Sequence, residues 1–139
     1  MKDKIFLDTN IILYQFSSDI QKKNMSVDTL DKAMQSSNYT ISYQVIQEFS
    51  NVALNKIKGY FSINELKTYI KDILVPLCKF YPDPNFYLNS LKIKEKYKFS
   101  YYDSLIINAA LELKCSKLFS EDLKANQKIE KLEIINPYK

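Results

Sequence analysis

The 139-residue chain is 46% apolar, which predicts one domain with a buried core, and its formal net charge of +4 is compatible with a polyanionic substrate. All 20 basic side chains are lysine, there is no histidine, and Gly59 is the only glycine. These absences exclude Ser-His and Cys-His catalysis, histidine-based ribonucleases, arginine clamps on phosphate and glycine-rich phosphate loops.

Apolar runs of strand length alternate with helical stretches, which predicts an α/β fold with a parallel sheet covered by helices. The predicted strands are residues 4–8, 39–42, a segment within 75–82, 117–120 and 132–136. The predicted helices are a short one that begins at residues 8–10, then 19–36, 43–58, one that Ser62 opens and Pro76 ends, 84–97 and 101–114. Residues 122–130 are predicted to form a short helix or a turn.

Four carboxylates stand where these strands end or these helices begin. Asp8 closes the first strand, and Asp122 follows the fourth. Glu48 and Asp103 lie in the first or second turn of helices that follow short strands or loops. Because the carboxyl ends of parallel strands share one edge of an α/β sheet, and the next helices begin there, we expect the four side chains to converge.

The surroundings of these acids favour a metal site. Most neighbouring residues are apolar, and a carboxylate at the margin of an apolar segment costs free energy unless something pairs with it. Four gathered carboxylates would also repel one another, and a divalent cation bound between them would remove that repulsion. Hard oxygen ligands suit Mg²⁺ or Mn²⁺ better than Zn²⁺, so the pattern predicts a metal-dependent hydrolytic site.

Each acid also has a purely structural explanation. Residues 8–10 are all good helix N-caps, and Glu48 could be a solvated surface side chain. The spacing Ser100-x-x-Asp103 fits a capping box, and residues 120–122 could form a cap or a turn. The functional interpretation therefore depends on the combination, because four acids stand in order at one sheet edge in a chain without other catalytic residue types.

Other features are less specific. Cys78 and Cys115 lack CxxC spacing and lie in apolar stretches, which predicts buried free thiols in a reducing compartment. With no membrane-length apolar run and no signal-peptide pattern, we expect a cytoplasmic protein. The lysine-rich run 92–98 could follow a phosphate backbone but is more often a solvated helix face, and Tyr101 and Tyr102 could stack on bases.

Several segments resemble the PIN domain, and specifically the VapC-type toxins of bacterial toxin–antitoxin pairs, nearly from end to end. FLDTNIILY resembles the opening strand with its Asp-Thr-Asn signature, and QVIQEF contains the second acid. SYYDSLIINAAL with Cys115 resembles the third motif, and LFSEDL with the closing INPYK resembles the fourth motif and the last strand. Relatives often follow the fourth motif with a glycine-containing turn, whereas this chain has LKANQK, in which we expect Asn126 to adopt the left-handed conformation.

The resemblance implies a three-layer α/β/α sandwich with a central, mostly parallel sheet of about five strands, formed by residues 1–139 as a single nuclease domain. It assigns the acidic metal site to Asp8, Glu48, Asp103 and Asp122, with Thr9 or Asn10 and Ser120 as supporting hydroxyl or amide groups. The implied activity is an endoribonuclease that depends on Mg²⁺ or Mn²⁺. The implied partners are an RNA substrate, a second copy of the chain and a protein antitoxin.

The resemblance makes Asp8 and Asp103 the expected direct metal ligands, and leaves Glu48 and Asp122 open as ligands, water-orienting bases or supporting partners. Three other functions compete with the toxin. A phosphatase with Asp8 as nucleophile would need a second aspartate two positions on, where Asn10 stands. A catalytically silent PIN-like binding module is disfavoured because all four acids are present, and a housekeeping RNA-processing PIN nuclease would use the same four acids. Transfer, ribosomal and messenger RNA all fit as substrates.

Overall fold

The computed structural model describes residues 3–56 and 61–138, and its centre is a six-stranded sheet in the order β3-β2-β1-β4-β6-β5. The strands are β1 (Ile5–Leu7), β2 (Tyr39–Ser42), β3 (Cys78–Phe80), β4 (Lys117–Phe119), β5 (Lys128–Ile129) and β6 (Leu132–Ile135). Only the pairing of β5 with β6 is antiparallel. The carboxyl ends of the other five strands therefore meet at one edge of the sheet.

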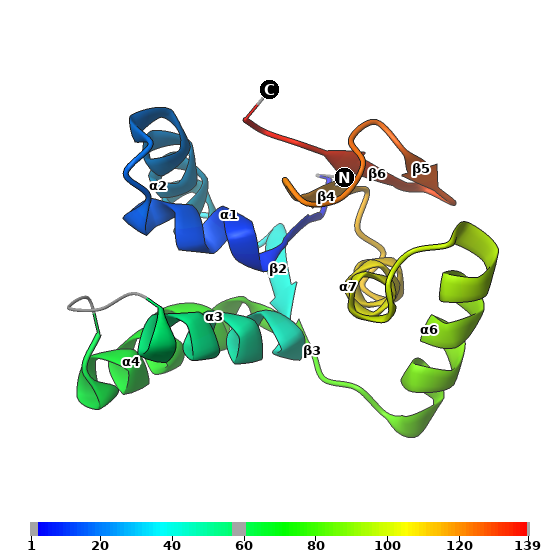
Figure 1. Cartoon of the computed structure of the whole chain (residues 1–139), viewed down its shortest axis with the longest axis horizontal. Coiled ribbons are helices and arrows are strands. Elements are labelled where there is room, and N and C mark those ends of the chain that lie inside the picture. The colour runs from blue at the N-terminus through cyan, green and yellow to red at the C-terminus, as the bar shows by residue number, and fades with distance from the viewer. Residues whose placement is uncertain (1–2, 57–60, 139) are drawn as a thin grey trace.

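Helices cover both faces of this sheet. They are α1 (Thr9–Leu13), α2 (Ile20–Met34), α3 (Tyr43–Asn55), α4 (Ile63–Tyr69), α5 (Val75–Leu77), α6 (Pro84–Tyr97) and α7 (Tyr101–Glu112). In Figure 1, α1 to α4 lie on one side of the strands and α6 and α7 on the other, so the predicted three-layer α/β/α architecture is confirmed. None of the helices in the described ranges is both long and apolar enough to cross a membrane.

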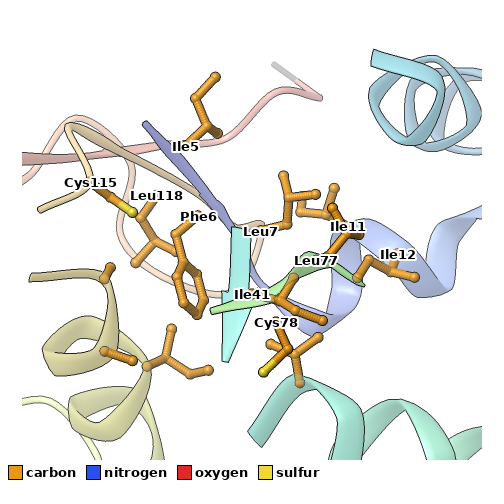
Figure 2. Packing of buried hydrophobic residues seen from close by; sticks show 14 of the residues in the cluster. Ile5, Phe6, Leu7, Ile11, Ile12, Ile41, Leu77, Cys78, Cys115 and Leu118 are labelled. Atoms are coloured by element: carbon orange, nitrogen blue, oxygen red, sulfur yellow. The ribbon is translucent and has the colours of Figure 1, made fainter. Parts of the chain in front are cut away.

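The core forms around β1, which lies between β2 and β4. Phe6 and Leu7 are completely buried, and Figure 2 shows their side chains leaving the strand on opposite sides. Phe6 stands opposite Leu118 of β4 in the parallel pairing. Because burying each such side chain stabilises the fold by roughly 1.5–3 kcal/mol, β1 is firmly held, and so is Asp8, the residue that follows it.

Of the two alternatives predicted for residues 122–130, the helix is wrong and the turn is present at residues 125–126. The last part of the segment is the short strand β5, which was not predicted and makes the sheet six-stranded rather than about five-stranded. Ile129 pairs with Leu132 across a tight reversal in which Glu130 has a positive φ of 55°. Asn126 has a φ of 66°, which confirms that it adopts the left-handed conformation expected in place of glycine.

Several helix ends also differ from their predictions. The helix predicted over 19–36 is observed as Ile20–Met34, and the one predicted over 101–114 ends at Glu112. The helix predicted to end at Pro76 continues one residue further, to Leu77. A π-helical segment, Ile70–Leu74, interrupts it, and α5 follows directly after that segment. Pro76 then stands in a first turn, where no backbone N–H is needed. The helix predicted over 43–58 ends at Asn55, and positions 57–58 lie outside the described residues.

Both cysteines are buried free thiols, as predicted. Cys78 begins β3, and Cys115 lies just before β4. Burial raises the pKa of the Cys115 thiol to about 11, so this thiol stays protonated near neutral pH. Its role is therefore packing rather than chemistry.

Candidate active site

The four predicted acids line one cavity of about 320 Å³. Asp8 comes from the end of β1, and Asp122 from the loop after β4. Glu48 lies in the second turn of α3, and Asp103 in the first turn of α7. The predicted convergence is thus present in the structure, at the edge where the parallel strands end.

Asp8 is the most deeply placed of the four acids, with only 7% of its surface exposed. One carboxylate oxygen caps α1 by accepting from the Thr9 amide at 2.7 Å, and the other accepts from the Ser120 hydroxyl at 2.7 Å. Burial raises the pKa of the Asp8 carboxyl to about 7. The two hydrogen bonds oppose the rise, whereas the nearby carboxylates of Glu48 and Asp122 add to it. Asp8 is therefore an acid whose charged form lacks compensation in the metal-free protein.

Glu48 is held from two helices. The Thr9 hydroxyl of α1 donates to Glu48 Oε1 at 2.5 Å. Gln44, one turn earlier on α3, extends its amide toward Glu48 Oε2 at 3.5 Å and donates to the Tyr102 carbonyl at 3.3 Å. These contacts tie α1, α3 and α7 together around the carboxylate. Gln44 was not among the predicted site residues, although its position four residues before Glu48 places it on the same helix face.

Asp122 is exposed and is held by a shorter network. The Asn10 side-chain nitrogen donates to Asp122 Oδ2 at 3.0 Å, and the Asn10 side-chain oxygen accepts from the Glu121 backbone amide at 3.3 Å. The Ser120 hydroxyl oxygen accepts from the Asp122 amide at 3.2 Å while it donates to Asp8. Each predicted supporting residue thus contacts an acid, and Thr9 and Asn10 both do so instead of serving only as helix caps.

Asp103 has the most available carboxylate. Its backbone amide donates to the Ser100 hydroxyl at 3.1 Å, which is one half of the predicted capping box. Within residues 3–56 and 61–138, the reciprocal bond from the Ser100 amide to the Asp103 side chain is absent, and no other donor reaches that carboxylate. The half-buried side chain can therefore bind a ligand without first breaking a hydrogen bond.

The donors in this cavity fit a hard, well-hydrated cation. Carboxylate, hydroxyl and amide oxygens line it together with Leu13, Val52 and Ile106. In the part of the chain that the structure describes, no three acidic or cysteine side chains form a ready-made cluster around one point. Mg²⁺ tolerates such a site because it keeps several of its waters and needs only one or two protein carboxylates.

A larger hollow, of about 630 Å³, lies elsewhere on the molecule, between α2 and the C-terminal segment. Its charged lining consists of Asp19, Lys22 and Asp28, and none of the four predicted acids reaches it. Since metal-dependent hydrolysis needs converging carboxylates, the smaller cavity is the candidate active site.

Comparisons with known proteins agree with this architecture. The family model described as the PIN domain matches residues 5–131. A solved toxin–antitoxin complex from Klebsiella pneumoniae superposes with a TM-score of 0.68 at 17% identity, covering 97% of this chain and 98% of that chain. The crystal structure of FitAcB from Neisseria gonorrhoeae superposes with a TM-score of 0.64 at 14% identity, covering 96% and 98%. At these identities the likeness concerns the fold, and no curated protein sequence matches the chain.

Proposed function

The chain belongs to the PIN domain family, and from that premise we propose that it is a metal-dependent endoribonuclease that acts as the toxin of a toxin–antitoxin pair. PIN domains are generally nucleases. The observation that carries the proposal is the convergence of Asp8, Glu48, Asp103 and Asp122 on one cavity. A chain without histidine cannot use the histidine acid–base catalysis of many ribonucleases, which leaves carboxylates as the groups suited to this chemistry.

Asp8 and Asp103 are the proposed direct ligands, since Asp8 is the most buried of the four acids and no donor among the described residues reaches the Asp103 carboxylate. When bound, Mg²⁺ or Mn²⁺ would lower the pKa of an attacking water and stabilise the leaving oxygen. Glu48, which accepts a hydrogen bond from the Thr9 hydroxyl, would align the water or accept its proton. Asp122 keeps Asn10 and the loop after β4 in position, and it can add a further ligand. Lysine side chains would hold RNA phosphates as point charges.

The proposal predicts RNA cleavage that depends on a divalent cation. Purified protein should cut RNA internally in Mg²⁺ or Mn²⁺ and stop when EDTA removes the metal, because the described residues that line the cavity include no lysine that could replace the missing positive charge. Gel analysis of a labelled RNA checks this, and sequencing the new 5′ ends identifies the RNA. Undiminished cleavage in EDTA would contradict the mechanism, and no cleavage under any metal condition would favour a silent binding module.

The toxin assignment predicts a protein inhibitor. One of the superposed structures is a toxin–antitoxin complex, so we expect a small neighbouring gene product to bind this chain and block the cavity. Expression of the chain alone should arrest growth, and co-expression of the neighbour should restore growth and yield a copurifying complex. Expression of the variant Asp8→Asn alone is the matched control and should be tolerated.

If the parent chain is tolerated alone and no neighbouring product binds it, the toxin role is wrong. A housekeeping RNA-processing nuclease with the same four acids would then be the better explanation. We also propose the homodimer that the family resemblance implies, and sedimentation of the purified chain at several concentrations tests it.

A further inference from the structure

Tyr102 has an unusual position for an aromatic residue. It lies in the first turn of α7, directly before Asp103, and 65% of its surface is exposed. An aromatic side chain stabilises a fold mainly by being buried, so Tyr102 contributes little to the core. Single exposed aromatic residues are common, however, so the exposure alone carries no functional meaning. The contacts of Tyr102 with neighbouring residues are what suggest a function.

The backbone of Tyr102 is fixed at the rim of the acidic cavity. Its carbonyl accepts a hydrogen bond from Gln44, a buried residue that lines that cavity. The ring of Tyr101 packs against the ring of Tyr102 with centroids 5.5 Å apart and planes at 65°. The exposed ring is therefore presented by a rigid helix and supported by a second aromatic ring.

Two further tyrosines connect this rim to α6. The pKa of Tyr43 on α3 is raised by burial, by a hydrogen bond with Tyr87 on α6, and by the nearby phenols of Tyr101 and Tyr102. Tyr87 therefore marks the flank of α6 that faces the rim. Residues seven positions apart on a helix share one flank, which places Lys94 in line with Tyr87 on α6.

Lys94 and Lys98 bring positive charge to the end of α6, close in the chain to the start of α7 where Tyr102 lies. Lys94 and Lys98 are exposed, and no carboxylate pairs with either of them within the described ranges. Lys98 ends α6 in a left-handed conformation with a φ of 64°, and only two residues separate it from α7. A strip of aromatic and cationic side chains therefore runs along α6 to the acid Asp103.

We propose that this strip binds single-stranded RNA, with Tyr102 stacking on an unpaired base beside the bond that is cut, and with Lys94 and Lys98 contacting the adjoining phosphates. This inference rests on the proposed ribonuclease function and names the residues that would hold the substrate beside the acids. A stacked base must be free of its partner strand, so the test uses an unstructured RNA. Aromatic platforms combined with basic residues are the general means of holding unpaired nucleic acid.

The test measures binding without cleavage. Fluorescence anisotropy of a labelled, unstructured 12-nucleotide RNA is followed in EDTA for the parent, Tyr102→Leu, Tyr102→Phe and Tyr81→Leu. Tyr81 is the matched control because it is 62% exposed and follows β3 outside the strip. Tyr102→Leu should weaken binding by about 5- to 150-fold, whereas Tyr102→Phe and Tyr81→Leu should stay within about twofold of the parent.

Salt dependence separates the two parts of the strip. Replacing Lys94 and Lys98 with alanine should lower the slope of log affinity against log salt by about 0.7 for each RNA phosphate that the protein no longer neutralises. Tyr102→Leu should leave that slope unchanged, since stacking releases no counterion.

Equal binding by the parent and Tyr102→Leu overturns the inference, and so does a parent that binds no RNA. If Tyr102→Leu instead leaves RNA binding intact and converts a dimer to a monomer in sedimentation, the strip is a contact between copies of the chain. Metal-dependent cleavage by the parent is measured separately, so the proposed function can stand when this inference fails.

Discussion

Asp8→Asn should lower the rate of RNA cleavage by at least about 100-fold while the protein stays folded, because the change removes one negative charge and leaves the shape of the side chain unchanged. The asparagine oxygen can still accept from the Thr9 amide, so the cap of α1 survives. The nitrogen that replaces the second oxygen can donate to the Ser120 hydroxyl oxygen once that hydroxyl turns. The substituted side chain is then a weaker ligand for a divalent cation in an otherwise intact cavity.

The matched control is Asp72→Asn, which removes the same charge from an exposed carboxylate in the π-helical segment, away from the cavity lining. This variant should cut RNA at the rate of the parent. Circular dichroism and thermal unfolding establish that both variants are folded. A folded Asp8→Asn protein that retains the parent's rate would remove Asp8 from the catalytic machinery.

The metal-free protein should become less stable as the pH rises from about 4 to about 7, and Asp8→Asn should abolish much of that loss. Burial raises the pKa of Asp8 from 3.8 to about 7 in the folded protein. Between these values the folded chain holds a proton that the unfolded chain has released, so the free energy of unfolding falls with increasing pH. A shift of this size corresponds to at most about 4 kcal/mol.

Urea unfolding in EDTA at pH 4 and pH 8 tests whether the free energy of unfolding falls as the pH rises. At pH 8 Asp8→Asn should be more stable than the parent by roughly 1–4 kcal/mol. At pH 4 most of that advantage should be lost, because the Asp8 carboxyl is protonated in the folded parent and close to half protonated in the unfolded chain. The difference between the two proteins isolates Asp8, since the other titrating groups are common to both. If the difference in unfolding free energy between the parent and Asp8→Asn does not change with pH, burial does not destabilise the Asp8 carboxylate.

Much of this arrangement could be predicted because strong local patterns marked it. The strand 39–42 and the helix 84–97 match their predicted bounds to the residue, the helix because a proline in its first turn and an aspartate cap mark its start. The meeting of Asp8, Glu48 and Asp122 followed from the parallel sheet, since five of the six strands end at the same edge. Asp103 lies on α7, which follows α6 rather than a strand, so the sheet alone did not place it. The two-residue strand β5 was missed because so short a segment has no periodicity, and its pairing is imposed by β6.

The roles within the cavity could not be read from residue types. Asp8 and Asp122 both stand at the end of a predicted strand, and nothing in the residue pattern showed that Asp8 is buried and Asp122 exposed. The difference arises from contacts between distant segments, such as the bond from Ser120 to Asp8 across 112 residues. The sequence did not mark Gln44 as a site residue. Its contacts with Glu48 and the Tyr102 carbonyl depend on how α3 and α7 are placed in space.

The most direct test is the binding of Mn²⁺ itself, followed by electron paramagnetic resonance as the ion is titrated into the purified protein. The parent and Asp72→Asn should bind Mn²⁺ with the same affinity. Asp8→Asn and Asp103→Asn should each bind it at least about tenfold more weakly, as expected when a ligand of the ion is removed. Equal Mn²⁺ affinity in all four proteins, or RNA cleavage by a parent that binds no Mn²⁺, would contradict a metal site formed by the acids of this cavity.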